Sequence, residues 1–371
     1  MGGNLYTMRR YQADEYRELE SEVVETIEYT LNTNVKGLLY YRNKESFGDM
    51  DILVEADFLP QNYMELIISA FNLNSISQSE TIKPSNWTKN GNVISFQYKK
   101  FQIDLILMSS QYFESAYYYY AYNDLGNLLG RLTHKMGFKF GHKGLSLIIR
   151  PTDGDDHVIG EVTVTQEIEE ILDIVGLDPY VYHKGFDDVE DIFKYVASSK
   201  YFNPEIYLLD NRNATSRIRD KKRKTYTEFL NWCEARKDEL PKFDFGSVVE
   251  KGGYSIREPW YTDKILSRYP EVEDIVDGLI YEYEQNKKLK EKLSGGVVMK
   301  VTGIEGKELG ILYRQIKETL LDRYSREQLI DMNAHTIECM IRSVKLCLDN
   351  GFKYPYIPVE FAENLIRNEG K

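Results

Sequence analysis

Two aspartates separated by one residue, Asp49 and Asp51, stand at the start of an apolar, β-prone run. On an extended strand, residues i and i+2 point to the same side, so both carboxylates can converge on one cation. A third acid, Asp104, lies in the middle of a second apolar run, residues 101–108, where an unpaired charge would be costly. Carboxylate oxygens are the ligands that Mg²⁺ prefers. If the two runs are neighbouring strands, the three acids predict a site for two Mg²⁺ ions, or Mn²⁺ in their place, suited to phosphoryl transfer.

A simpler interpretation needs no ligand. Asp49 and Asp51 would then mark the entry to a strand, and Asp104 would be a solvated residue on an edge strand. The glycine before the pair, Gly48, the two apolar runs and the third acid together favour the metal site over this alternative.

The composition is that of a globular protein, with 42% hydrophobic and 29% charged residues in a chain of 371. This length predicts two or three domains. A net charge of −12 argues against a uniformly basic nucleic-acid binder but permits a local basic groove. Three cysteines without metal-like spacing favour a reducing compartment. With no apolar signal segment and no apolar run of membrane-spanning length, we expect a cytoplasmic protein without a membrane partner.

The hydrophobic spacing predicts an α+β fold with a mixed or antiparallel sheet. The expected elements are a helix over 14–31, a strand over 36–41, the aspartate strand, a helix over 61–72, and strands over 93–99 and 101–108. Residues 186–371 show helical spacing throughout.

A tyrosine-rich segment precedes a predicted helix that begins near residue 123. Tyr119 and Tyr120 end the segment, and Asp124, Asn127 and Arg131 share one face of the helix. This face is either a binding surface or the solvated side of a core helix.

The densest positive charge lies between Arg212 and Lys224, where Asp220 is the sole acid. We expect this stretch to contact nucleic-acid phosphates, with a solvated helix face as the alternative. The residues assigned to nucleic-acid binding are Arg217, Arg219, Lys221, Lys222, Arg223 and Lys224.

The acid motifs, the paired tyrosines and the helix after them resemble the palm and thumb of DNA polymerase beta and its family X relatives, over roughly residues 10–185. The resemblance implies that Asp49, Asp51 and Asp104 are catalytic and bind two Mg²⁺ ions. It also implies a nucleotide-binding set, with the tyrosines under the incoming nucleotide and the helix face on the base and minor groove: Arg42, Gly48, Tyr119, Tyr120, Asp124, Asn127 and Arg131.

The chain departs from the family pattern at three places. Gly37-Leu38-Leu39 stands where the family has Gly-Ser, so one hydroxyl to the nucleotide phosphate is missing. Tyr122 replaces a small residue after the paired aromatics, and Gln102 replaces an arginine before the third acid. The nucleotide pocket is therefore expected to differ in shape and selectivity.

Residues 301–317 carry an apolar stripe and three glycines, and they are similar to the C-terminal signature of CCA-adding tRNA nucleotidyltransferases. The same pattern also suits a helical packing motif. Three functions are left open: a family X–like DNA polymerase, which we favour, a tRNA 3′-end nucleotidyltransferase, and a non-catalytic nucleic-acid-binding protein.

The expected domains are a palm over 1–110, a thumb or nucleotide-binding subdomain over 111–185 and a helical nucleic-acid-binding region over 186–371. The expected partners are a nucleoside triphosphate and a DNA primer or tRNA 3′ end, with no obligatory protein partner.

Overall fold

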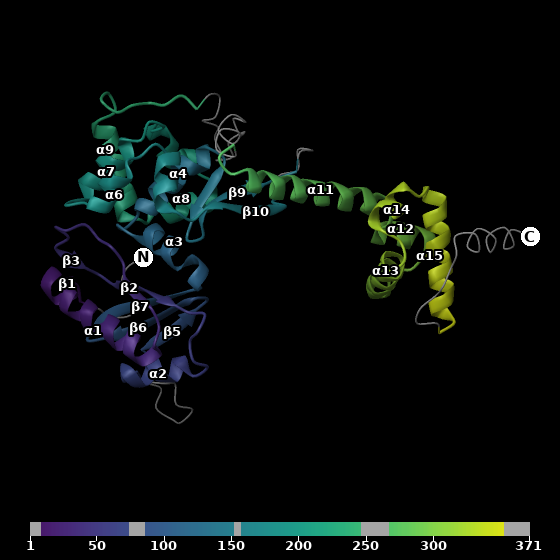
Figure 1. The fold of residues 1–371 in the computed structure, drawn as a ribbon, viewed down its shortest axis with the longest axis horizontal. Helices are drawn as coiled ribbons and strands as arrows, with labels where there is room; N and C mark the ends of the chain where they lie inside the picture. Colours follow the sequence, from purple (N-terminus) through teal and green to yellow (C-terminus); the bar gives the residue numbers. More distant parts are fainter. Residues whose placement is uncertain (1–8, 74–85, 152–156, 246–266, 352–371) are drawn as a thin grey trace, which may run out of the picture. The chain divides into compact units, whose positions relative to one another are not determined.

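The computed structural model describes residues 9–73, 86–151, 157–245 and 267–351 (Figure 1). The chain forms two compact units. The first comprises Met1–Ile148 and Glu161–Glu273, and the second comprises Ile149–Gly160 and Asp274–Lys371. The boundary expected at residue 186 falls inside the first unit, because helices beyond it pack onto the elements before it.

A five-stranded sheet organises the first unit. Its order is β2-β4-β7-β6-β5, and β4 and β7 run parallel whereas the other neighbours are antiparallel. The predicted α+β class with a mixed sheet is therefore confirmed. The strands are β2 (Val35–Gly37), β4 (Met50–Glu55), β5 (Trp87–Asn90), β6 (Val93–Tyr98) and β7 (Phe101–Met108). A two-stranded pair, β1 (Tyr11–Gln12) and β3 (Ser46–Phe47), lies beside it.

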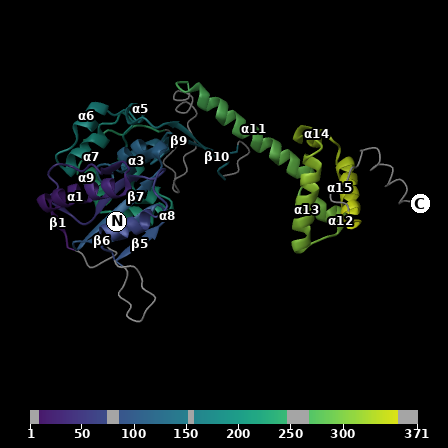
Figure 2. The same cartoon turned by 60° about the horizontal axis from the view of Figure 1, so that its bottom comes forward.

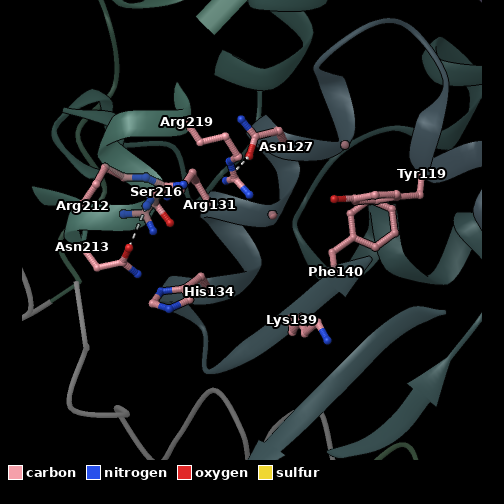
Figure 3. A pocket seen from close by; sticks show the side chains of 12 residues that line it. Tyr119, Asn127, Arg131, His134, Lys139, Phe140, Arg212, Asn213, Ser216 and Arg219 are labelled. Carbon is pink, nitrogen blue, oxygen red and sulfur yellow. Dashed lines mark hydrogen bonds between the residues drawn. The ribbon is translucent and has the colours of Figure 1, made fainter. Parts of the chain in front are cut away.

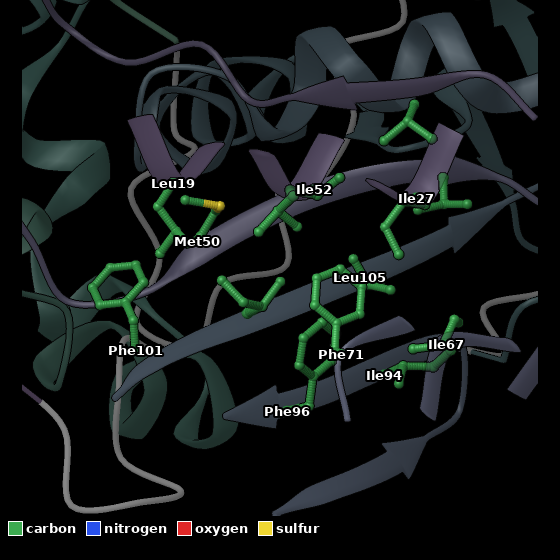
Figure 4. Packing of buried hydrophobic residues seen from close by; sticks show 14 of the residues in the cluster. Leu19, Ile27, Met50, Ile52, Ile67, Phe71, Ile94, Phe96, Phe101 and Leu105 are labelled. Carbon is green, nitrogen blue, oxygen red and sulfur yellow. The ribbon is translucent and has the colours of Figure 1, made fainter. Parts of the chain in front are cut away.

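Helices α1 (Ala13–Leu31) and α2 (Tyr63–Ala70) cover one face of this sheet (Figure 1). The apolar stripe of α1, from Leu19 to Ile27, meets alternate strand residues such as Ile52 and Leu105 (Figure 4). Full burial of each such side chain stabilises the fold by roughly 1.5–3 kcal/mol. The expected helices over 14–31 and 61–72 and the expected strands over 93–99 and 101–108 are confirmed, each to within a few residues.

The expected strand over 36–41 is shorter than predicted, since only Val35–Gly37 pairs with β4. The following residues turn away to other partners. The carbonyl of Leu39 accepts a hydrogen bond from the Tyr122 amide at 2.7 Å, and the Arg42 amide donates to Phe186 at 3.0 Å. Backbone groups that find partners elsewhere cannot extend the ladder.

The opposite face of the sheet packs on α3 (Phe113–Tyr120), which follows the short 3-10 helix η1 (Ser110–Tyr112). Leu53 and Ile106 meet Phe113 and Ala116 there. Because side chains alternate along a strand, Asp51 and Asp104 lie on this second face, beside the residues that contact α3. The fold thus separates an apolar face under α1 and α2 from a face that carries the acids.

Helix α4 (Leu125–Lys135) follows α3 and packs on a three-stranded sheet of order β10-β9-β8. Its strands are β8 (Phe138–Gly141), β9 (Gly144–Ile149) and β10 (Gly160–Thr165). The junction between α3 and α4 is tight. A Cβ atom on Gly126 would lie 2.1 Å from the Tyr119 carbonyl oxygen, so only glycine fits there.

The remaining described part of the first unit is helical, as expected for the residues beyond 186. Its elements are α5 (Ile168–Ile174), α6 (Pro179–Lys184), α7 (Val189–Ala197), η2 (Pro204–Tyr207), η3 (Leu209–Asn211), α8 (Ala214–Lys221) and α9 (Lys224–Ala235). An aromatic cluster holds them together: the ring centroids of Tyr207 and Phe229 are 4.9 Å apart, and those of Phe193 and Phe229 are 5.2 Å apart.

The second unit is a helical bundle of α11 (Pro270–Lys292), which begins in the first unit, α12 (Gly295–Thr302), α13 (Gly306–Leu321), α14 (Arg326–Asp331) and α15 (Ala334–Asp349). Helices α12, α13 and α15 pack side by side (Figure 1, Figure 2). Within the described ranges, no helix has both the length and the apolar character needed to span a membrane.

The tail stretch over 301–317 forms the end of α12, a turn and most of α13. Gly303 adopts a left-handed conformation, with φ at 70°, and ends α12. Leu312 and Ile316 of α13 are buried in the core of the bundle. Helix capping and core packing thus account for the main features of the stretch that resembles the CCA-adding signature.

The close approach of α3 and α4 predicts opposite effects at two glycines of one helix. Gly126→Ala should lower the free energy of unfolding by about 1–3 kcal/mol, because the added methyl group overpacks the junction. Gly130→Ala is the matched control, since its Cβ would meet nothing closer than 3.8 Å. That change should stabilise the protein by about 0.5–1 kcal/mol through helix propensity. Thermal unfolding of both variants measures the difference, and equal midpoints would contradict the tight junction.

Candidate metal centre and adjoining basic cavity

Three carboxylates meet where β4 and β7 run side by side. Asp51 is the direct register partner of Asp104 in the parallel pair, and Asp49 lies two residues before Asp51. One oxygen from each of the three acids lies within 4.8 Å of the others. The sequence prediction that neighbouring strands bring these acids together is confirmed. A cluster of this kind is compatible with a divalent metal ion, because it offers three hard oxygen ligands within reach of one ion.

The electrostatics of the cluster fit a cation. Burial, as the main cause, and the charges of Asp49 and Asp104 together raise the pKa of Asp51 to about 7. Burial also raises the pKa of Asp49, with a contribution from Asp104. Like charges in a half-buried site disfavour one another's ionised forms. A divalent cation between these oxygens would remove this repulsion, so the donor set fits Mg²⁺ or a similar hard ion.

Gln102 orients the third acid. Its Nε2 donates hydrogen bonds to both carboxylate oxygens of Asp104, at 3.1 and 2.9 Å, and the residue is only 3% exposed. Gln102 thus holds Asp104 where the family X pattern has an arginine, without adding a positive charge. In the sequence analysis, Gln102 was noted only as a departure from the arginine of the family X pattern. The spacing i and i+2 on one strand was the signal that it shares a face with Asp104.

Lys44 is a cation that the structure brings toward the acids, and Arg10 also lies close enough to act on the charge of Asp49. Burial lowers the pKa of Lys44, and the negative charges of Asp49 and Asp51 oppose that shift. Its Nζ donates to Asn123 Oδ1 at 3.2 Å and lies 4.4 Å from the Phe47 ring centroid. Sequence reasoning did not single out Lys44, although it lies only five residues before Asp49.

Arg42, expected to bind nucleotide phosphate, is engaged elsewhere in the structure. Its guanidinium pairs with Asp187 and donates to the Lys184 carbonyl at 2.9 Å. Gly48 remains beside the acids, and a Cβ on it would lie 3.1 Å from Arg10 Nη1. A side chain at position 48 would therefore crowd the approach of that arginine.

The paired tyrosines point to two different places. Tyr120 lies close enough to Asp51 for that charge, together with burial and Tyr119, to raise the Tyr120 pKa to about 12, with burial as the main cause. Tyr119 lines a cavity on the other side and packs perpendicular to Phe140, with ring centroids 5.2 Å apart. The two residues that end α3 therefore face different sites, Tyr120 the acid cluster and Tyr119 the cavity.

The predicted face of α4 is held by the basic stretch that follows it in the chain. Asp124 forms an ion pair with Arg223, and Asn127 Oδ1 accepts a hydrogen bond from Arg219 Nη2 at 3.2 Å. Arg131 is 5% exposed and donates from Nε and Nη2 to the Ile206 carbonyl, at 3.1 and 2.7 Å. The structure thus brings the α4 face and the basic stretch together, which sequence reasoning did not anticipate.

The basic stretch itself divides into arginines that bind the protein and lysines that face solvent. Arg217 Nε donates to the Leu209 carbonyl at 3.0 Å, and Arg219 and Arg223 contact α4. By contrast Lys221, Lys222 and Lys224 are exposed. Among the residues assigned to nucleic-acid binding, these three lysines offer exposed ammonium groups to a partner, and Lys224 also lies 3.5 Å from Glu228 Oε1.

A cavity of about 290 Å³ lies between α4, β8 and the start of α8 (Figure 3). The side chains of Arg131, Arg212, Ser216 and Arg219 line it, and the rings of Tyr119 and Phe140 lie across from Arg212 (Figure 3). Arg212, which is 5% exposed, also pairs with the fully buried Asp220 at 2.7 Å.

No known family model matches the chain, and a search of curated proteins finds no significant relative.

The repulsion within the acid cluster predicts that removing one carboxylate stabilises the metal-free protein and reduces the stabilisation that added metal gives. In EDTA, Asp51→Asn should increase the free energy of unfolding by on the order of 1–3 kcal/mol, because it removes a costly charge from the acid cluster. The melting temperature should rise accordingly. The same variant should lose most of the stabilisation that Mg²⁺ or Mn²⁺ gives the wild type, since a ligand that binds only the folded state raises its stability.

Asp238→Asn, at an exposed turn outside the cluster, is the control and should change neither quantity. Thermal unfolding with and without metal measures both. An unchanged metal response in Asp51→Asn would show that the ion binds elsewhere.

Proposed function

We propose that this protein is a metal-dependent nucleotidyltransferase with a polymerase beta–like palm. The observation that carries the proposal is the convergence of Asp49, Asp51 and Asp104 on two adjacent strands, with oxygens within 4.8 Å of one another. In the proposed reaction, the 3′-hydroxyl oxygen of a nucleic acid bonds to the α-phosphorus of a nucleoside triphosphate, and the hydroxyl proton passes to solvent. The bond from that phosphorus to the bridging oxygen breaks, and pyrophosphate leaves.

In this proposal, Asp49 and Asp51 would hold both Mg²⁺ ions and Asp104 would complete the ligand set of one. When bound, the two ions would stabilise the attacking and leaving oxygens. Gln102 keeps Asp104 in one orientation, so that little reorganisation is needed before reaction.

Lys44 supplies a partly buried positive charge on the side of Asp49 and Asp51, which suits the neutralisation of triphosphate charge. Tyr120 places an aromatic body beside Asp51, where it can support the sugar of the incoming nucleotide. Arg42 could take part in phosphate binding only by exchanging its contact with Asp187.

We favour a primed DNA strand as the acceptor. Asp124, Asn127 and Arg131 lie on one helix face, and such a face is useful for reading a base pair. Its use by a duplex requires the contacts from Arg219 and Arg223 to be exchanged for contacts with DNA. Arg131, which is buried, would also have to give up its hydrogen bonds to the Ile206 carbonyl. A tRNA 3′ end is the alternative acceptor. It was suggested by residues 301–317, and helix packing already accounts for much of the pattern of those residues.

The direct test supplies the enzyme with a gapped DNA primer and dNTPs and, separately, with a tRNA lacking its CCA end, CTP and ATP. We expect Mg²⁺-dependent extension of the DNA primer. Asp104→Asn should reduce turnover by at least 10³-fold, because charge stabilisation at the reacting phosphate is usually the largest catalytic contribution. Asp104→Asn should keep the wild-type melting temperature or exceed it.

Three results would change the proposed function. Extension of tRNA with little use of DNA would make the protein a tRNA 3′-end nucleotidyltransferase. Incorporation into neither, with retained nucleic-acid binding, would favour the non-catalytic alternative. Wild-type turnover by Asp104→Asn would remove the acid cluster from the mechanism.

The exposed lysines of the basic stretch predict a salt-dependent contact with the polynucleotide. Replacing Lys221, Lys222 and Lys224 with Ser should weaken DNA binding and flatten the plot of log K against log salt by about one unit for each lost phosphate contact.

The control replaces Lys184, Lys194 and Lys237 with Ser, which removes the same charge from other exposed positions of the first unit. Fluorescence anisotropy over a range of salt concentrations measures both slopes. Equal slopes in the two triple variants would show that the stretch is only a solvated face.

A further inference from the structure

The cavity between α4, β8 and α8 is rich in hydrogen-bond donors. Its lining includes Arg131, Arg212, Arg219 and Asn127, with Ser216 at the first turn of α8. Among the described residues that line it, none carries a carboxylate. The chemistry of this surface is therefore suited to a ligand that is anionic and rich in acceptor oxygens.

Positive charge is in excess around the cavity. Asp220 is the acid that contacts these arginines, lying 2.7 Å from Arg212 and 3.1 Å from Arg219. One buried carboxylate thus faces three guanidinium groups, counting Arg131. Burial, as the main cause, and the nearby charge of Arg212 together lower the pKa of Arg131 to about 10. Two guanidinium groups held this close leave a positive potential that a bound anion would relieve.

Buried donors in the cavity wall have no partner. Within the described residues, neither Arg212 Nε nor Asn127 Nδ2 has a hydrogen bond, although both atoms are buried. A buried N–H without an acceptor costs roughly 1–3 kcal/mol. The N-terminus of α8 adds to this pattern, because Asn213 and Ser216 place the first turn of the helix, with its positive dipole end, at the cavity.

The size and lining indicate more than a bare anion. At about 290 Å³ the cavity is near the lower end of small-molecule pockets and far larger than a few water molecules. The rings of Tyr119 and Phe140, which lie across from Arg212, offer an apolar wall for a sugar or base (Figure 3).

We propose that this cavity binds the phosphate group of a nucleotide or of a nucleic-acid strand end, as a site separate from the aspartate cluster. Arg131, Arg212, Arg219 and the first turn of α8 hold the phosphate, and the aromatic wall holds the attached nucleoside. The identity of the ligand as a nucleotide rests on the proposed function, whereas the preference for phosphate rests on the donors alone.

The test introduces a negative charge at Ser216 and compares it with the neighbouring residue. Ser216→Asp places a carboxylate in the cavity wall, and an acid in the first turn of a helix does not harm folding. Thr215→Asp is the matched control, because Thr215 is exposed, lies in the same turn and does not line the cavity. Arg219→Gln is a second test variant, which removes a guanidinium group from the cavity lining instead of adding a carboxylate, and it does so at an exposed side chain.

Calorimetric titration in EDTA keeps the aspartate site from contributing. The probes are inorganic phosphate, adenosine 5′-monophosphate and a single-stranded oligonucleotide with and without a 5′-phosphate. We expect the monophosphate to bind the wild type, Ser216→Asp to weaken binding at least tenfold and Thr215→Asp to change it less than twofold. Tighter binding of the phosphorylated oligonucleotide than of the monophosphate would identify the strand end as the source.

No binding of any probe at millimolar concentration, or equal loss in Ser216→Asp and Thr215→Asp, would overturn the proposal. The result is independent of catalysis. Nucleotide transfer without probe binding would leave the proposed function standing and remove the cavity site, and probe binding in an inactive protein would do the reverse.

Discussion

The parallel pairing of β4 with β7 places Asp51 directly beside Asp104, and the rest of the first unit depends on this contact. A parallel pair needs a crossover, and the chain provides it through α2, β5 and β6. The pairing costs free energy in the metal-free state, because like charges are held together where burial already raises the pKa of Asp51. The apolar face under α1 and α2 offsets that cost through side chains such as Ile52 and Leu105, which are fully buried.

Helix α3 connects the acids to the rest of the unit. Its apolar side packs on the sheet through Phe113, and its last residues, Tyr119 and Tyr120, reach the basic cavity and the acids respectively. Gly126 then lets α4 approach the end of α3 closely. A small change in the direction of α3 would therefore alter the surroundings of both sites. The proposed transfer site and the proposed phosphate site therefore both depend on the position of α3.

The sequence predicted the parts of the fold that depend on local periodicity. The helix of residues 14–31 and the hairpin of 93–108 follow from apolar spacing, and the meeting of Asp49, Asp51 and Asp104 follows from strand alternation. Long-range partners were not predictable in the same way. The contact of Arg42 with Asp187 joins residues far apart in the chain, and so does the ion pair of Arg223 with Asp124. Neither pair has a signature in local spacing, since any exposed arginine could pair with any nearby acid.

The central claim is that the three aspartates bind divalent metal as part of a nucleotide site. Crystals grown with Mn²⁺ and a non-hydrolysable nucleoside triphosphate test it directly through anomalous scattering from manganese. The account predicts anomalous density between the carboxylates of Asp49, Asp51 and Asp104, with the triphosphate oxygens completing the coordination. Nucleotide bound in the crystal with no manganese at these carboxylates would contradict it.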